Sequence, residues 1–119
     1  MLAVEDDADL GQLLIDIFMI AGYEVRWASN RAEINAQLRR GDEIDVVLMD
    51  VLLPDADGLE ILQRLRAHPR FGTIPVIMMT GLSAAQDVSA GLAAGADGYV
   101  TKPFQMSGLV KAVGMVLGV

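Results

Sequence analysis

The chain has 119 residues, of which 53% are hydrophobic and 21% charged, a size and composition typical of one globular domain rather than a disordered chain. The net charge of −7, with no basic cluster longer than Arg39-Arg40, argues against direct nucleic-acid binding, and the absence of cysteine excludes disulfides and thiolate metal sites. No apolar run reaches membrane-spanning length and no signal-peptide pattern is present, so we expect a cytoplasmic protein with no membrane contact.

Apolar patterns predict strands that alternate with helices along the whole chain. In chain order, the first half is expected to form a strand at 1–5, a helix at 9–22, a strand at 23–28, a helix at 30–41 and a strand at 45–50. Gly22 and Gly41 are expected to end the two helices, and Asn30 with Glu33 has nearly the spacing of a capping box.

The second half continues the same alternation. It is expected to form a helix at 58–68, a strand at 74–80, a helix at 83–95, a strand at 97–102 and a helix at 105–117. Ser83 and Gln86 again have capping-box spacing, whereas Gly108 and Gly114 weaken the last helix.

This alternation predicts an α/β fold, a five-stranded parallel sheet covered on both faces by helices and joined by right-handed crossovers. We expect one domain over residues 1–119, because no linker, repeat or low-complexity tract interrupts the pattern. In open sheets of this kind the functional site lies beyond the carboxyl ends of the strands.

Polar residues follow four of the five predicted strands. The first strand ends in three acids at 5–7, the third in Asp50, the fourth in Thr80 and the fifth in Lys102. Each alone has an ordinary structural explanation as a helix cap, a turn residue or a surface lysine. Together at one edge they indicate a site.

Carboxylates brought close together repel one another unless some are protonated or a cation joins them. Oxygen ligands at a partly exposed edge suit Mg²⁺, which keeps several waters. A cation, a lysine and a threonine hydroxyl could neutralise and position a phosphoryl group, and a carboxylate can be its nucleophile.

These residues resemble the receiver domains of two-component response regulators. The resemblance covers almost the whole chain and rests on four motifs in order: VEDD at 4–7, LMDVLLPDADG at 48–58, PVIMMTG at 75–81 and GADGYVTKPF at 95–104. It implies a doubly wound, flavodoxin-like sheet with strand order 2-1-3-4-5.

The resemblance also implies a role for each acid. Asp50 corresponds to the phosphoacceptor and also to a metal ligand. Asp6 corresponds to a direct Mg²⁺ ligand, Glu5 to a ligand acting through water, and the backbone carbonyl of Leu52 to a further ligand. Asp7 falls outside the acidic pair.

Four further residues match the switch and phosphoryl-binding part of the family pattern. Thr80 corresponds to the switch hydroxyl and Lys102 to a second phosphoryl contact. Tyr99 corresponds to an aromatic switch residue that moves inward with Thr80, and a cis peptide bond is implied before Pro103.

The function so implied is phosphorylation of Asp50 by a histidine kinase or a histidine phosphotransfer protein. The modification would change the surface of the helix at 83–95, the strand at 97–102 and the helix at 105–117, through which a downstream protein or output domain, or a homodimer partner, could bind. Such a domain is not a turnover enzyme, although it catalyses its own phosphorylation and slow hydrolysis.

Two departures from the family pattern carry expectations. The chain begins only three residues before Val4, so the first strand is short for a central position. Leu52 and Leu82, two residues after Asp50 and Thr80, offer no side chain to orient an attacking water, which predicts slow loss of the phosphoryl group.

Three other functions stay open. A degenerate receiver would act only as an interaction module. A phosphohydrolase with an aspartyl nucleophile would carry that residue after the first strand, and a nucleotide or flavin binder would need a glycine-rich or hydroxyl-rich loop there, where this chain has acids. His68 is interpreted as a loop residue, and Trp27 has no assigned function.

Overall fold

The computed structural model describes residues 1–40, 44–53, 55–80, 85–101 and 105–118. In these parts strands and helices alternate as expected, with most elements beginning or ending one to three residues inside the predicted bounds. The strands are β1 (Leu2–Val4), β2 (Arg26–Ala28), β3 (Val47–Asp50), β4 (Leu52–Leu53), β5 (Ala56–Asp57), β6 (Val76–Thr80) and β7 (Gly98–Thr101). The helices are α1 (Ala8–Ile20), α2 (Arg31–Arg39), α3 (Gly58–Ala67), α4 (Ala85–Ala93) and α5 (Met106–Leu117).

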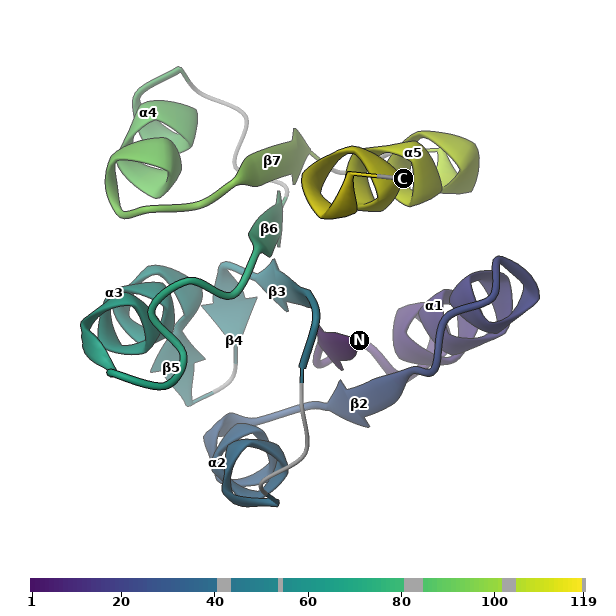
Figure 1. Cartoon of the computed structure of the whole chain (residues 1–119), viewed down its shortest axis with the longest axis horizontal. Helices are drawn as coiled ribbons and strands as arrows, with labels where there is room; N and C mark the ends of the chain where they lie inside the picture. The colour runs from purple at the N-terminus through teal and green to yellow at the C-terminus, as the bar shows by residue number, and fades with distance from the viewer. Residues whose placement is uncertain (41–43, 54, 81–84, 102–104, 119) are drawn as a thin grey trace.

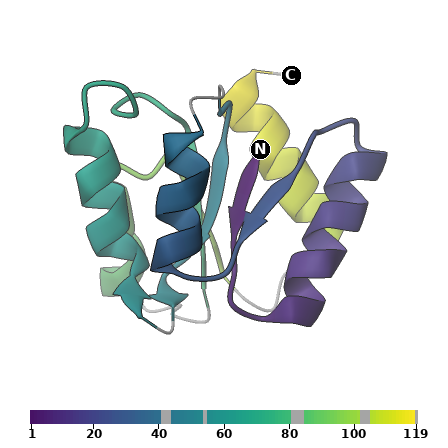
Figure 2. The ribbon, with the colours of Figure 1, turned by 90° about the horizontal axis from the view of Figure 1, so that it is seen from below.

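Five of the strands form one parallel sheet in the order β2-β1-β3-β6-β7, which confirms the predicted 2-1-3-4-5 topology (Figure 1). The helices α1 and α5 cover one face, while α2, α3 and α4 cover the other (Figures 1 and 2). The structure is therefore the doubly wound, flavodoxin-like α/β fold that the resemblance implied.

Each face of the sheet has its own hydrophobic core. Alternate residues of β1 show the division, since Leu2 and Val4 pack toward α2 and α3, whereas Ala3 packs toward α1 and α5. On the first side Ile34 and Leu62 are buried, and on the second Phe18 and Leu109. Period-two alternation of this kind is what a strand buried on both faces requires.

The first strand is short, as expected, yet it lies in the middle of the sheet. All three of its residues are buried, and they pair with Arg26–Ala28 on one side and with residues 47–49 on the other. The central position of β1 offsets its short length, because its backbone groups find hydrogen-bond partners in the strands on both sides.

Local sequence signals act at several helix ends. The carboxylate of Asp7 accepts from the backbone N–H groups of Asp9 and Leu10 at the start of α1, and Asn30 caps α2 in the same way through Glu33 N–H. After α1, Gly22 has a φ of 97°, the left-handed conformation that commonly ends a helix. The predicted stop at Gly41 and cap at Ser83 lie outside the described residues.

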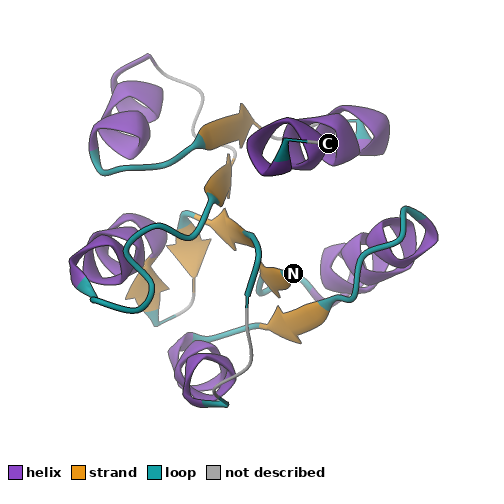
Figure 3. Cartoon of the chain, in the orientation of Figure 1, coloured by secondary structure: helices purple, strands orange, loops and turns teal. Residues whose placement is uncertain are grey.

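The strands β4 and β5 were not expected. They form a small antiparallel pair, separate from the main sheet, in the segment between β3 and α3 (Figure 3). A strand of two residues is too short to show a hydrophobic periodicity that could be recognised in the sequence. Among the described helices, none is both long and apolar enough to cross a membrane.

Candidate functional site

The register of the sheet brings the carboxyl ends of four strands to one edge. Val4 pairs with Met49, Asp50 pairs with Met79, and Thr80 pairs with Thr101. Because all four strands run in the same direction, their carboxyl ends lie side by side, which is the geometry that the sequence predicted.

Three acids meet at this edge. Carboxylate oxygens of Glu5, Asp6 and Asp50 lie within 4.8 Å of one another. Glu5 is 1% exposed and Asp50 is 5% exposed, whereas Asp6 is exposed to solvent. Like charges this close repel one another strongly when they are screened from water, so a cation between them would be favourable.

The donor set fits a hard divalent cation. All three side chains offer carboxylate oxygens, one of them on the solvent side, which suits Mg²⁺ with its preference for oxygen ligands and retained waters. The residues present are therefore compatible with the metal that the resemblance implies.

Asp7, the third acid of the EDD run, is not part of this cluster. Its side chain instead caps α1, with distances of 2.9 Å from Asp9 N and 3.2 Å from Leu10 N to its Oδ1 atom. The run is thus divided between a metal-binding geometry and a helix cap. The helix-cap interpretation of the acidic run is confirmed for Asp7, and Glu5 and Asp6 remain candidate metal ligands.

The segment after Asp50 is held close to the sheet. The N–H of Val51 donates to Met79 O at 3.2 Å, and the N–H of Gly58 donates to Val51 O at 2.7 Å. A Cβ atom at position 58 would lie 2.4 Å from Asp50 O, so only glycine permits this approach. Leu52 pairs with Asp57 through its backbone in the β4–β5 hairpin.

The remaining predicted residues are placed only in part. Thr80 ends β6, next to the partner of Asp50, but its side chain lies outside the described part of the structure. Lys102, Pro103 and Leu82 also lie outside it, although Thr101, the residue before Lys102, is the last of β7.

Tyr99 lies in β7 and is half-buried. It packs against the core between the sheet and α3, and a Cβ atom at Gly91 of α4 would lie 2.9 Å from its ring. The side chain thus bridges α4 and β7, two of the elements that the resemblance assigns to the switching surface.

Trp27 is the residue at this site that sequence reasoning missed. Its indole Nε1 donates to the backbone carbonyl of Glu5 at 2.7 Å across the junction of β1 and β2. No local motif signals this contact, because the two residues are far apart in the chain and only the sheet brings them together.

Comparisons with known proteins agree with this geometry. A family model described as the response regulator receiver domain matches residues 1–114. The chain is 35% identical over 117 residues to the transcriptional regulatory protein GltR of Pseudomonas aeruginosa, covering 98% of this chain and 48% of that protein. It is 36% identical over 117 residues to the transcriptional regulatory protein BaeR of Escherichia coli, with 98% and 47% covered. The chain spans about half the length of the curated relatives it matches.

Solved structures give the same result. The chemotaxis protein CheY4 of Vibrio cholerae superposes with a TM-score of 0.89 at 31% identity, covering 98% of this chain and 96% of that chain. The signal receiver domain of a histidine kinase from Syntrophus aciditrophicus gives 0.86 at 33% identity, covering 98% and 88%. The chain therefore belongs to the response regulator receiver domain family, the signal-receiving domains of two-component systems.

Proposed function

We propose that residues 1–119 act as one receiver domain in which Asp50 accepts a phosphoryl group in the presence of Mg²⁺. The observation that carries this proposal is the cluster of Glu5, Asp6 and Asp50, which places a nearly buried nucleophile beside two further carboxylates. Bound Mg²⁺ would neutralise charge on the phosphoryl oxygens as they approach the acidic edge.

In the proposed reaction a carboxylate oxygen of Asp50 attacks the phosphorus of a phosphohistidine donor. The new O–P bond forms as the P–N bond breaks, and the histidine of the kinase or phosphotransfer protein leaves with the electron pair of that bond. Glu5 and Asp6 would hold the metal, with the backbone carbonyl of Leu52 as a further ligand. Lys102 and the Thr80 hydroxyl would contact the phosphoryl oxygens.

The modification is expected to act through electrostatics. A phosphoryl group adds about two negative charges and three strong acceptor oxygens. Movement of Thr80 and Tyr99 toward it would then alter the surface formed by α4, β7 and α5. Tyr99 already contacts both the α4 side and the core, which supports its role as the link.

The test is incubation with acetyl phosphate and Mg²⁺, followed by intact mass measurement. One added phosphoryl group is expected in the wild type, and none in Asp50→Asn. Asp16→Asn is the matched control, because Asp16 is an exposed acid of α1 whose carboxylate accepts a hydrogen bond from the side chain of Gln12. Labelling that persists in Asp50→Asn, or no labelling of the wild type, would contradict the proposal and favour an interaction module without phosphorylation.

The lifetime of the modification is a separate expectation. Since Leu52 and Leu82 cannot orient an attacking water through their side chains, hydrolysis should be slow. The decay of phosphorylated protein should accelerate in Leu52→Asn or Leu82→Glu, and an unchanged rate in both variants would show that these positions do not control it.

Binding partners follow from the same proposal. A histidine kinase or phosphotransfer protein would supply the phosphoryl group, and a downstream protein, an output domain or a second copy would bind the altered α4–β7–α5 surface. Light scattering before and after phosphorylation distinguishes a homodimer from a monomer that binds another protein.

A further inference from the structure

Both polar backbone atoms of Glu5 are held by two consecutive residues of β2. The N–H of Glu5 donates to Ala28 O at 3.0 Å, and its carbonyl accepts from the indole of Trp27 at 2.7 Å. Glu5 follows the last residue of β1, where the ladder of the sheet stops. The indole therefore adds one more hydrogen bond between this chain segment and β2, at Glu5, the first residue of the acidic pair.

The position of the indole depends on a glycine in α1. A Cβ atom at Gly11 would lie 2.5 Å from Cε2 of Trp27 and 2.8 Å from its Nε1, so any other residue would displace the ring. Glycine inside a helix costs about 1 kcal/mol relative to alanine, so a helical glycine needs a compensating contact. Here the ring lies directly against the helix backbone.

The acidic cluster explains why such an attachment matters. Glu5 and Asp6 are neighbours in a short connection between β1 and α1, and Asp50 lies opposite them with carboxylate oxygens within 4.8 Å. Repulsion among the three charges favours movement of the connection away from Asp50. Asp7 anchors its far end by capping α1, and Trp27 anchors its near end.

We propose that Trp27 is a positioning residue for the metal-binding acids. By holding the Glu5 carbonyl, its N–H keeps Glu5 and Asp6 in the geometry that a cation needs before the cation arrives. Preorganised ligands bind more tightly because binding does not have to order them. This inference rests on the proposed function, because it assumes that the cluster binds Mg²⁺.

A spectroscopic consequence follows from the composition of the chain. Trp27 is the single tryptophan, and its ring is hydrogen-bonded to the backbone of Glu5, which supplies one of the three carboxylates. Mg²⁺ binding should therefore change the tryptophan emission of the wild type. The same titration of Asp50→Asn should leave the emission unchanged.

The decisive experiment separates the effect of the Trp27 N–H on Mg²⁺ affinity from the effect of its ring. Mg²⁺ affinity is measured by calorimetry on the whole 119-residue chain in three forms: the wild type, Trp27→Phe, and a protein with β-(3-benzothienyl)alanine at position 27. The benzothienyl ring has the shape of indole with sulfur in place of N–H. If the net hydrogen-bond contribution of about 0.5–1.5 kcal/mol is lost from binding, Mg²⁺ should bind roughly two- to twelvefold more weakly.

We expect weaker binding in both variants, with the benzothienyl protein keeping one cooperative urea transition at a slightly lower midpoint, because the hydrogen bond is also present without the cation. Mg²⁺ affinity equal to the wild type in the benzothienyl protein would overturn the inference while leaving the proposed function intact. A wild type that shows no Mg²⁺ binding distinguishable from Asp50→Asn would instead overturn the proposed function. Gly11→Ala, which displaces the ring, should weaken Mg²⁺ binding as Trp27→Phe does.

Discussion

Two polar clusters occupy opposite edges of the same sheet and differ in the charges that they bring together. At the carboxyl edge Glu5, Asp6 and Asp50 bring like charges together. At the amino edge Arg66 and Asp97 pair at 2.9 Å, where β6 and β7 begin. The first arrangement is the candidate site for a cation, whereas the second joins a cation and an anion of the protein itself.

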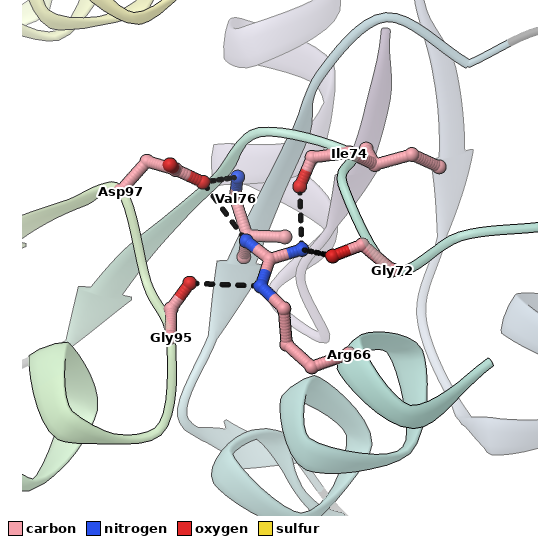
Figure 4. A network of polar contacts seen from close by, with 6 residues as sticks. All are labelled: Arg66, Gly72, Ile74, Val76, Gly95 and Asp97. Carbon is pink, nitrogen blue, oxygen red and sulfur yellow. Dashed lines mark hydrogen bonds and ion pairs between the residues drawn. The ribbon is translucent and has the colours of Figure 1, made fainter. Parts of the chain in front are cut away.

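The Arg66 cluster shows what a purely structural network looks like (Figure 4). The guanidinium donates to the carbonyls of Gly95 at 2.9 Å, Ile74 at 2.6 Å and Gly72 at 3.4 Å. The Asp97 carboxylate also accepts from Val76 N–H at 2.9 Å. Charge and donors are matched within the cluster, and this matching ties α3, the start of β6 and the α4–β7 turn together.

The comparison indicates how function can be recognised in a fold of this kind. Arg66 and Asp97 are paired with each other and bonded to the backbone, while the candidate site gathers three carboxylates where the strands end. Changes at the two edges should therefore separate stability from metal binding.

The largest expected effect is on stability, from Arg66→Ala. It removes the cation from the Asp97 carboxylate and the donors from three backbone carbonyls, and should lower the free energy of unfolding by about 2–4 kcal/mol. Urea unfolding measures this loss. Arg66→Lys should recover only part of it, because an ammonium group cannot reproduce the planar set of donors. A loss below about 0.5 kcal/mol in Arg66→Ala would show that the network contributes little.

Gly58→Ala should disturb the acidic edge through the backbone. The new Cβ would lie 2.4 Å from Asp50 O and 2.8 Å from Val51 Cα, and backbone atoms cannot move aside as a side chain can. The expected loss is about 1–3 kcal/mol together with reduced phosphorylation by acetyl phosphate. Gly108→Ala is the control, since a Cβ there meets no atom within 4 Å in the structure, and it should stabilise α5 slightly.

Mg²⁺ itself should distinguish the two clusters. At a concentration ten times its dissociation constant, the cation should raise the free energy of unfolding of the wild type by about 1.4 kcal/mol. Asp50→Asn should lose nearly all of this increment, whereas Arg66→Lys should keep it. Urea unfolding with and without Mg²⁺ measures both, and an increment retained by Asp50→Asn would place the metal elsewhere.

The smallest expected effect concerns the N-terminal cap of α2, which lies near the acidic edge. Its hydrogen bonds join Ser29, Asn30 and Glu33 to one another. Asn30 Oδ1 accepts from Glu33 N–H at 2.9 Å, while the Glu33 carboxylate accepts from both the N–H and the hydroxyl of Ser29 at 2.7 Å. Asn30→Ala should lower stability by about 1 kcal/mol in urea unfolding. A larger loss would mean that the cap also supports the site.

The same cap has a pH signature. The hydrogen bonds from the Ser29 hydroxyl and backbone N–H lower the pKa of Glu33 below its ordinary value of 4.5. Because the folded-state pKa is the lower one, the contribution is complete above pH 4.5 and is lost as the pH falls through the lowered value. Glu33→Gln should weaken the acid dependence of unfolding below that pH, and an unchanged profile would contradict it.

The edge that carries the site was predictable because strand ends are visible in the chain. Apolar runs that stop at Glu5, Asp50 and Thr80 require only local pattern and the rule that parallel strands end together. The contact between Trp27 and Glu5 was not predictable in this way, since 22 positions separate the two residues and their approach depends on the pairing of β1 with β2.

The sequence by itself determined the alternation of elements, the cap at Asn30, and the set of acids from which a site could be built. Only the tertiary structure decided that Asp7 caps α1, that Trp27 bonds the carbonyl of Glu5, and that Arg66 reaches the turn before β7. Periodicity and capping act within a few residues of the chain. Which charges meet depends on register and helix packing, and these are settled only when the sheet forms.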